Sequence, residues 1–497
     1  MKDKRFIEVS FPVKEISEIS AKEKNIRHGH ISTLHIWWAR RPLASSRATN
    51  YAALISASKS PEEWDKTRQF IIELAKWENS LNPRIIEKAR KDILGVNGGK
   101  APKILDPFAG GGSIPLETLR LGCEVHAIEY NPVAVLILKC TLEYPQKYGK
   151  LKEIDAKNKL GFEEKKKVNP LLEDVRKWGN RVLEEAKKEI GRFYPKDEDG
   201  SIPVGYIWAR TIPCQNPACG AEIPLMRQFW LARKNNKKVA LYPYVEEKEV
   251  KFKIVGDGYE KMPDGFDPSK GTVSRAIATC PVCGYTVDDK TTRKLFQEGK
   301  AGERMVTVVL NKSGTTGKRY RLATEKDLEV FKEAEKYLEK KRKKLMDEWG
   351  IDPVPDEELP PKETLGFRVQ RYGMLKWGDL FNSRQKLALI TFTEKVRLAY
   401  QKMIEEGYDE EYAKAIVSYL ALGVNRLADK NSSLCRLIPQ TEAIGFTYGR
   451  QALPMLWDFI EMCPYEHSSG WYTILDETLE NLSHLSQISP IRRMKEE

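Results

Sequence analysis

The chain has 497 residues, 83 basic against 71 acidic, for a net charge of +12 and a calculated isoelectric point near 9.0. A chain of this length has room for about three domains and can bury a sizeable core. No apolar run approaches the roughly 18–20 residues of a membrane span, and no apolar signal core follows the basic N-terminus. We therefore expect no membrane association, no export signal and a cytoplasmic location.

The basic excess favours a polyanionic partner, because phosphate neutralisation dominates nucleic-acid affinity. Solvated lysine-rich helices would give the same excess, so both interpretations stay open. The eight cysteines do not form a dense disulfide framework, and four of them have the paired spacing of metal ligands. This usage indicates a reducing compartment.

In chain order, the N-terminal region predicts helices, including one from Ala44 to about Ala57. Two strand–turn units fill roughly 103–145, and charged helical periodicity covers 165–192. Short β-like runs between 205 and about 321, with cysteine pairs at both ends, predict an inserted small β domain.

Beyond the insert, the sequence predicts mostly helix. Thr324 is the expected N-cap of a charged helix that reaches Trp349. A proline-rich linker follows, because adjacent prolines cannot continue a helix. The remainder predicts helices at roughly 383–406, 409–428, 449–462 and 471–485.

The stretch Lys103-Ile-Leu-Asp-Pro-Phe-Ala-Gly-Gly-Gly-Ser113 predicts a buried parallel strand that ends in a glycine loop. Asp106 would then lie at the carboxyl edge of the strand, where open α/β sheets bind ligands. Gly110 and Gly112 would let the backbone approach a ligand without a Cβ in the way. Pro115 suits the first turn of the helix that follows.

A second apolar strand follows that helix and ends in Glu129, about 20 residues past the loop. This is the spacing expected for an acid that accepts both ribose hydroxyls of a nucleoside cofactor. The form Phe108-x-Gly110-x-Gly112 behind Asp106-Pro107 points to S-adenosylmethionine, since no arrangement here gives the Gly-x-Gly-x-x-Gly of dinucleotide sites. A glycine turn without a ligand is the alternative. The expected cofactor-binding residues of this region are Asp106, Pro107, Phe108, Gly110, Gly112, Glu129 and Asn131.

Two cysteine pairs, Cys214-Gln-Asn-Pro-Ala-Cys219-Gly and Cys280-Pro-Val-Cys283-Gly, each form a short turn closed by glycine. Four thiolates in this spacing can converge on one tetrahedral zinc ion, with the glycine relieving the turn. The gap of about 60 residues between the pairs is long for a ribbon, although the β-like runs within it could form hairpins. We expect a structural Zn²⁺, because four ligands leave no open position for catalysis.

An aromatic and basic segment lies upstream of the glycine loop. His28, His30 and His35 precede Trp37-Trp38 and Arg40-Arg41. A metal site is conceivable, but no acids that would complete it are apparent. Arg41-Pro42-Leu43 begins a helix, and amino-methyltransferases of DNA often place a helix here that contacts the methionine end of the cofactor. Arg41 and Pro42 are therefore further candidate cofactor contacts, and a helix packed around a tryptophan anchor is the alternative.

The chain resembles the zinc-ribbon-containing adenine-specific DNA methylase family, whose N-terminal region is a domain of unknown function (DUF1156). The resemblance runs through nearly the whole chain. The matching segments are 27–43, 105–117, the two cysteine pairs, Tyr372-Gly-Met-Leu-Lys-Trp-Gly-Asp-Leu-Phe381, Asn431-Ser-Ser-Leu-Cys-Arg436 and Tyr448-Gly-Arg-Gln-Ala-Leu-Pro-Met-Leu-Trp-Asp-Phe459.

This resemblance implies an α/β fold with a Rossmann-like methyltransferase sheet, an inserted zinc-ribbon-like β domain and a helical C-terminal region. It also implies S-adenosylmethionine as cofactor and methyl transfer to N6 of adenine in DNA. The expected domains are a DUF1156-like helical segment at 1–100, a cofactor-binding core at 101–200, the zinc-ribbon insert at 201–323, a charged helix and linker at 324–365, and the helical region at 366–497.

The family also carries a downstream Asp-Pro-Pro-Tyr tetrapeptide that binds the target amine, and no such tetrapeptide occurs here. A methyltransferase sheet has about seven strands, yet only two or three good candidates for it are apparent. The expectation is therefore the N-terminal part of a split or truncated DNA methyltransferase, with catalytic residues unknown. A second polypeptide would complete the sheet and supply the amine-binding motif, because an unpaired apolar edge is a pairing liability.

Three other functions stay open on this sequence: an RNA methyltransferase, a non-catalytic DNA-binding subunit of a modification or defence system, and a zinc-bearing scaffold whose cofactor site has decayed. Basic residues of the insert are candidate phosphate contacts, with a solvated β surface as the alternative. They are Arg233, Lys234, Lys237 and Lys238.

Overall fold

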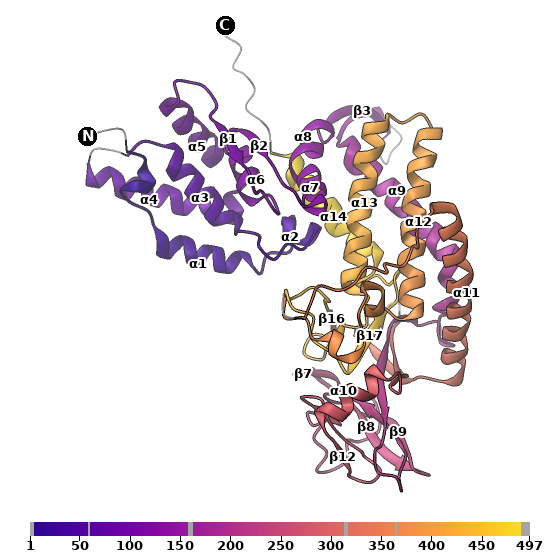
Figure 1. The fold of residues 1–497 in the computed structure, drawn as a ribbon. Helices are drawn as coiled ribbons and strands as arrows, with labels where there is room; N and C mark the ends of the chain where they lie inside the picture. The colour runs from indigo at the N-terminus through magenta and orange to yellow at the C-terminus, as the bar shows by residue number, and fades with distance from the viewer. Residues whose placement is uncertain (1–3, 58–59, 158–162, 313–316, 363–364, 489–497) are drawn as a thin grey trace. The chain divides into compact units, whose positions relative to one another are not determined.

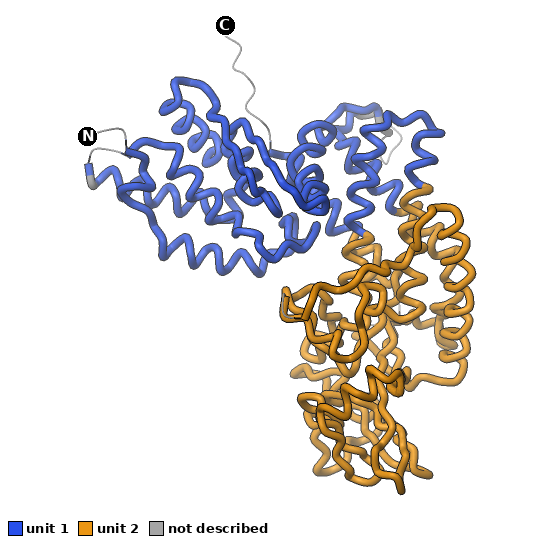
Figure 2. Tube along the Cα trace, viewed as in Figure 1, with its two compact units in different colours: residues 1–179, 399–423, 475–497 blue, residues 180–398, 424–474 orange. Residues whose placement is uncertain are grey.

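The computed structural model describes residues 4–57, 60–157, 163–312, 317–362 and 365–488. The chain is a mixed α/β protein in which helices alternate with small sheets (Figure 1). It divides into two compact units (Figure 2). Unit 1 comprises 1–179, 399–423 and 475–497, and unit 2 comprises 180–398 and 424–474.

The N-terminal part of unit 1 is a helical layer. Its helices are α1 (Val13–Glu23), α2 (Ile31–Leu34), α3 (Leu43–Leu54), α4 (Pro61–Ala75) and α5 (Pro83–Val96). The predicted helix at 44–57 is thus confirmed as α3. Proline at the first position of α4 and α5 suits the helix start, since its missing N–H would have no partner there. The buried apolar side chains of α1, α3, α4 and α5 form one core.

A parallel pair of strands follows this layer: β1 (Lys103–Asp106), α6 (Ser113–Arg120) and β2 (Glu124–Ala127). Ile104 and Val125 pair in register and face the core beneath α3 and α5. The opposite face of the two strands is exposed along its length, and Leu105 is 59% exposed there. Among the described residues, β1 and β2 pair only with each other. The sequence predicts a Rossmann-like sheet, and in this region the structure has one parallel pair of strands.

The rest of unit 1 continues from β2 through α7 (Pro132–Leu138), a π-helical turn (Lys139–Glu143) and α8 (Tyr144–Tyr148). An antiparallel pair, β3 (Lys152–Lys157) and β4 (Glu163–Val168), comes next. Four long helices contain residues of both units: α9 (Pro170–Ile190), α12 (Ser383–Glu405), α13 (Glu410–Lys430) and α14 (Trp471–Ser486). No described helix is both long enough and apolar enough to span a membrane.

Unit 2 contains four of the sheets, the smallest of which pairs β15 (Arg436–Ile438) with β16 (Ala443–Gly445). A five-stranded sheet has the order β14-β13-β5-β17, with β6 paired to β5, and two three-stranded sheets are β7-β8-β9 and β10-β11-β12. The strands are β5 (Ile202–Pro213), β6 (Glu222–Leu225), β7 (Trp230–Lys234), β8 (Lys237–Glu246), β9 (Glu249–Gly256), β10 (Val273–Ser274), β11 (Ile277–Thr279), β12 (Thr286–Val287), β13 (Gly302–Asn311), β14 (Arg319–Leu322) and β17 (Asp458–Met462). The predicted β-rich insert is confirmed in its strands, but β17 joins its central sheet from far downstream.

Two helices accompany these strands, α10 (Asp289–Gln297) and α11 (Glu325–Trp349). Thr324 caps α11 as predicted: its amide and hydroxyl both donate to a carboxylate oxygen of Asp327, each at 2.8 Å. The predicted helices near 383–406, 409–428 and 471–485 are confirmed as α12, α13 and α14. The predicted helix at 449–462 is wrong, because that stretch is irregular up to β17, which pairs with β5.

A buried ion pair holds α12 against the five-stranded sheet of unit 2. Arg384 of α12 and Glu461 of β17 are both fully buried and their charged groups are in contact. The other oxygen of Glu461 accepts hydrogen bonds from the Trp208 indole at 2.8 Å and from the Asn382 amide at 3.0 Å. The guanidinium lies 3.9 Å from the centroid of the Tyr206 ring. This network joins α12, β5 and β17.

Candidate cofactor site and metal centre

The glycine loop leaves β1 and enters α6 with two residues in the left-handed region. Gly110 has φ +50° and Gly112 has φ +78°, values that side chains with a Cβ rarely adopt. The loop remains attached to the strands, because the Ala109 amide donates to the Ile128 carbonyl at 3.0 Å. The loop therefore lies at the carboxyl end of both parallel strands, as the sequence predicts.

Glu129 organises this edge. One carboxylate oxygen accepts a hydrogen bond from the Gly110 amide at 2.7 Å. The other accepts from the amides of Tyr130 at 2.8 Å and Asn131 at 3.1 Å. These backbone donors, the Asn131 amide first, hold the pKa of Glu129 below its usual range. A carboxylate has about four acceptor positions, so this ionised side chain retains capacity for a further donor.

The other predicted residues lie at the start of the loop or shortly after Glu129. The Asp106 carboxylate accepts a hydrogen bond from the Phe108 amide at 3.2 Å. The Phe108 side chain is 87% exposed, and Pro107 is exposed beside it. The Asn131 side chain caps α7 by accepting from the Val133 amide at 2.9 Å. Asn131 therefore orients the helix that follows β2, a role its sequence position did not reveal.

Trp37 and Arg40 pack directly against the glycines, which sequence analysis did not predict. A Cβ on Gly110 would lie 2.9 Å from the Trp37 indole nitrogen, and one on Gly111 would lie 3.1 Å from Nε of Arg40. These glycines are therefore required by close packing as well as by backbone conformation. The signal was present in the sequence only as aromatic and basic residues upstream of the loop.

Arg41 and Pro42 lie at the start of α3, as predicted, with Pro42 as its N-cap residue. The carbonyl of Arg41 accepts a hydrogen bond from the Ser113 hydroxyl at 2.7 Å. Ser113 is the first residue of α6, directly after the glycine loop. The structure thus brings the segment that contains Arg41 and Pro42 to the loop that contains Gly112.

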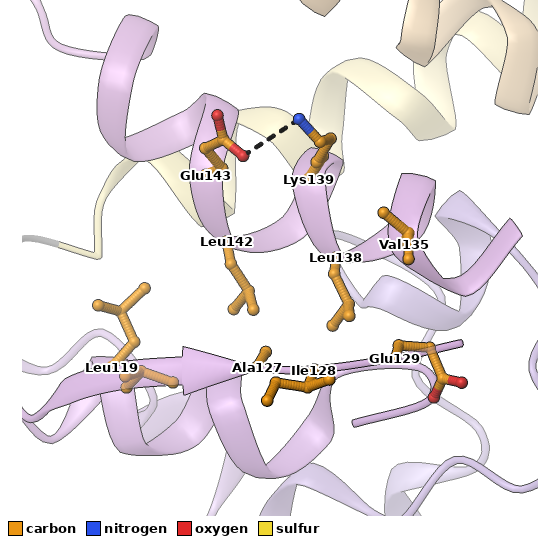
Figure 3. A pocket seen from close by; sticks show the side chains of 10 residues that line it. Leu119, Ala127, Ile128, Glu129, Val135, Leu138, Lys139, Leu142 and Glu143 are labelled. Atoms are coloured by element: carbon orange, nitrogen blue, oxygen red, sulfur yellow. Dashed lines mark ion pairs between the residues drawn. The ribbon is translucent and has the colours of Figure 1, made fainter. Parts of the chain in front are cut away.

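A cavity of about 570 Å³ runs beside β2 and reaches Glu129 (Figure 3). Most of its lining is apolar, and Leu138 and Leu142 point from the helical side toward Ala127 and Ile128. Its other charged groups are Lys139 and Glu143, an ion pair with 3.6 Å between nitrogen and oxygen. The size and the mostly apolar lining are typical of small-ligand pockets.

The histidines upstream of the loop have separate partners. His30 is buried and its Nε2 lies 3.0 Å from a carboxylate oxygen of Glu23. The two oxygens of Glu23 also accept the amides of Leu43 and Ala44 at 2.7 Å each, so Glu23 holds the start of α3. His28 lies 3.1 Å from Glu480 on the surface. Among the described residues these histidines join no metal-ligand cluster, so their conceivable metal site is not supported.

The four predicted metal ligands lie together. The sulfur atoms of Cys214, Cys219, Cys280 and Cys283 all lie within 4.8 Å of one another. The sulfur of Cys214 lies 3.6 Å from that of Cys283, and the sulfur of Cys219 lies 3.9 Å from that of Cys280. Sulfur ligands about 2.3 Å from a tetrahedral zinc ion would be separated by about 3.8 Å. The cluster can therefore hold one metal ion such as zinc.

Two hairpins present these thiols. The first cysteine pair connects β5 to β6, and the second connects β11 to β12. The glycine after each pair has a left-handed backbone, with φ +64° at Gly220 and +74° at Gly284, as the sequence indicates. The backbone amide of Tyr285 lowers the pKa of Cys283 to about 7, whereas burial raises that of Cys214 to about 12.

Two of the lysines proposed as phosphate contacts are used within the protein. Lys234 and Lys237 both form ion pairs with Glu442, whose side chain is 2% exposed. Lys237 also donates to the carbonyl of Lys318. Arg233 has its guanidinium carbon 5.7 Å from the centroid of the Trp230 ring. The positive charge of Lys234 and Lys237 is therefore directed at a buried carboxylate.

Comparison with known proteins gives one partial match. Residues 10–79 match the family described as Protein of unknown function (DUF1156). These residues contain α1 to α4, including the segment that packs on the glycine loop. No curated protein and no solved structure matches the chain.

Proposed function

We propose that this chain is the cofactor-binding part of an S-adenosylmethionine-dependent methyltransferase that acts on the exocyclic amine, N6, of adenine in DNA. One observation carries the proposal. The carboxylate of Glu129 lies at the carboxyl end of β2, directly against the left-handed glycine loop that follows β1. Such an edge is where open α/β sheets bind nucleoside cofactors.

In this proposal Glu129 accepts one ribose hydroxyl of the cofactor at its remaining acceptor position, on the oxygen that also accepts the Gly110 amide. Gly110 and Gly112 give the cofactor close access to the backbone, and Asp106 with Pro107 borders the methyl-transfer site. The adenine ring occupies the apolar cavity beside Ile128, which starts next to Glu129. Phe108 and Asn131 are the remaining proposed contacts to the adenosyl end of the cofactor.

The methionine end of the cofactor is assigned to the start of α3. Arg41 and Pro42 lie there, and the hydrogen bond from Ser113 ties their segment to the glycine loop. A guanidinium is suited to a carboxylate, which it can bind through two parallel hydrogen bonds. When bound, S-adenosylmethionine supplies a methyl group on a positively charged sulfur, which the target amine takes up directly.

The cysteine cluster is assigned a structural Zn²⁺ held by Cys214, Cys219, Cys280 and Cys283. Four thiolate ligands close the coordination shell, so the ion stabilises the two hairpins and takes no part in methyl transfer. The separations of the sulfur atoms support this assignment. It makes the β-rich part of unit 2 the zinc ribbon of the proposed family.

We further propose that a second polypeptide completes the sheet. Parallel strands are normally covered on both faces, yet one face of β1 and β2 is exposed. Leu105 of β1 is 59% exposed, and Ile128, directly after β2, is 56% exposed. Each strand also has a free edge among the described residues. The partner would pair with the free edge of β1, cover the exposed face and supply the acceptors for the adenine amine.

Isothermal titration calorimetry with S-adenosylmethionine tests the cofactor assignment. The wild-type chain should bind one equivalent, and Glu129→Gln should weaken binding by about tenfold or more, because it removes a charged acceptor. Glu124→Gln, which removes an exposed charge on the same strand, is the matched control and should leave binding unchanged. Absence of binding heat, or equal affinity in Glu129→Gln, would refute the proposal.

A further inference from the structure

The aromatic ring of Phe446 lies on the surface of unit 2 among cations. Phe446 follows β16 (Ala443–Gly445, labelled in Figure 1) and is 45% exposed. The guanidinium carbon of Arg426 lies 5.3 Å from the centroid of its ring, and Nζ of Lys430 lies 5.8 Å from it. Arg426 and Lys430 belong to α13 and are almost fully buried. The ring therefore covers two cations and presents its other side to solvent.

The acidic residues of the chain segment around this ring do not reach the surface. The stretch 424–457 contains two acids, Asp429 and Glu442, and each is 2% exposed. Asp429 pairs with Arg426 at 2.7 Å, and Glu442 pairs with Lys237 at 2.8 Å. Both carboxylates are thus engaged by cations inside the protein.

The exposed charges of the same stretch are all positive. Arg436 and Arg450 are exposed, and in the part of the chain that the structure describes neither has a carboxylate within ion-pair distance. Arg436 is paired in register with Gly445, and a Cβ on that glycine would lie 2.9 Å from Cγ of Arg436. The absence of a side chain at Gly445 lets the Arg436 side chain lie over this glycine, the residue directly before Phe446.

Strands β15 (Arg436–Ile438) and β16 form a hairpin next to Phe446 in the chain. Residues of β7, β8 and β14 hold this hairpin in place. Glu442 lies in the turn of the hairpin. Its carboxylate accepts hydrogen bonds from Nζ of Lys237 at 2.8 Å and from the Tyr320 hydroxyl at 2.5 Å. The Arg233 amide donates to the carbonyl of Pro439 at 2.8 Å. Lys234 and Lys237, which the sequence suggested for phosphate, therefore anchor the hairpin. Of the exposed cations, Arg436 is on the hairpin and Arg450 follows it in the chain.

We infer that Phe446, Arg436 and Arg450 form a contact surface for a DNA strand. The ring stacks on an unstacked base, and the two guanidiniums bind neighbouring phosphates. Aromatic rings beside cations are the usual means of binding single-stranded nucleic acid, because every base has a face that can stack. Phosphate contacts of this kind position a strand and read no sequence. The choice of DNA rests on the proposed function.

Fluorescence anisotropy with a labelled single-stranded DNA of about 20 nucleotides tests the surface in the full chain. Phe446→Ala should weaken binding roughly tenfold, since base stacking on an aromatic ring has about this effect. Tyr472→Ala is the matched control, because Tyr472 is similarly exposed, at 42%, on α14. It should bind as the wild type does.

The arginines are tested through salt dependence. Arg436→Gln with Arg450→Gln should reduce the slope of log affinity against log salt by about 1.4, from two lost phosphate contacts on a single strand. The matched control is Lys336→Gln with Lys340→Gln, two exposed lysines on α11. Thermal unfolding and circular dichroism of each variant establish that it folds as the wild type does.

Wild-type affinity and salt slope in the Phe446 and arginine variants would overturn the inference, as would equal losses in the control variants. Tighter binding of RNA of the same length would overturn the assignment to DNA. Titration with S-adenosylmethionine on the same preparations separates the two proposals. Loss of strand binding with intact cofactor binding supports this surface, and failure of cofactor binding in the wild type contradicts only the proposed function.

Discussion

The sheets of the two units differ in how their strands are covered. In unit 2, β5 is paired on both sides and its residues are buried from Val204 to Ile212. In unit 1, β1 and β2 alternate between half-buried and exposed residues, and no covering layer lies on the exposed face in the part of the chain that the structure describes. Both sheets have strands with apolar residues, so the difference is in their surroundings. A sheet whose strands are buried by residues of the same chain is suited to a structural role. A sheet with one exposed face beside a glycine loop is suited to forming a site around a ligand.

The largest expected effect concerns the proposed metal site in unit 2. Cys280→Ser, or removal of metal with a strong chelator, should destabilise the two hairpins by at least about 5 kcal/mol, because binding of a structural zinc is coupled to folding. Zinc content by inductively coupled plasma mass spectrometry should fall from one per chain to near zero. Cys123→Ser, which changes a buried cysteine of unit 1, is the control and should keep its zinc. Full zinc content in Cys280→Ser would contradict the assignment.

The buried ion pair of unit 2 should give the next largest effect. Glu461→Gln should lower the free energy of unfolding by about 3–5 kcal/mol, because it leaves the Arg384 guanidinium buried without a compensating charge. The double variant Arg384→Met with Glu461→Leu removes both charges and should recover much of that loss. Urea denaturation measures both. Equal stability of Glu461→Gln and wild type would show that this network does not fix the sheet.

The stability of unit 1 should depend on pH through His484. Burial and the charge of Arg120 lower the pKa of His484 to about 3. Below pH 6.5 the unfolded chain binds a proton here that the folded chain does not, so stability falls as pH decreases from about 6.5. The loss should reach about 2 kcal/mol at pH 5.

Urea denaturation at pH 7.5 and pH 5 measures this dependence. His484→Leu should flatten it, whereas His126→Gln, which changes an exposed histidine on β2, should not. An unchanged pH dependence in His484→Leu would assign the acid sensitivity to other groups.

The smallest expected effect is at the glycine loop. Gly112→Ala should destabilise unit 1 by only about 1–2 kcal/mol, the cost of a left-handed backbone at a residue with a Cβ. Its effect on cofactor affinity should be larger than that of Gly95→Ala, at which an added Cβ meets nothing within 4 Å. Thermal unfolding and calorimetric titration measure the two effects. Wild-type stability and wild-type cofactor affinity in Gly112→Ala would contradict the assignment of this loop to the cofactor site.

The parts that the sequence predicted well are local in the chain. The strand, glycine loop, helix, strand and acid lie within 103–129, and each cysteine pair lies in one hairpin turn. Thr324 was predictable as a cap for the same reason, since its partner Asp327 is three residues away.

The parts that it missed depend on distant contacts. β17 is a strand because it pairs with β5, whose residues lie far upstream. Trp37 meets Gly110 only after α3 packs against α6. Local propensity contains no information on such pairings.

The central claim is that the edge formed by Gly110, Gly112 and Glu129 binds the adenosyl end of S-adenosylmethionine. A crystal structure of the full chain with S-adenosylhomocysteine tests it most directly. The account predicts a ribose hydroxyl within hydrogen-bond distance of Glu129 and the adenine ring in the cavity beside Ile128. An empty edge at saturating ligand, or the ligand bound elsewhere on the chain, would contradict it.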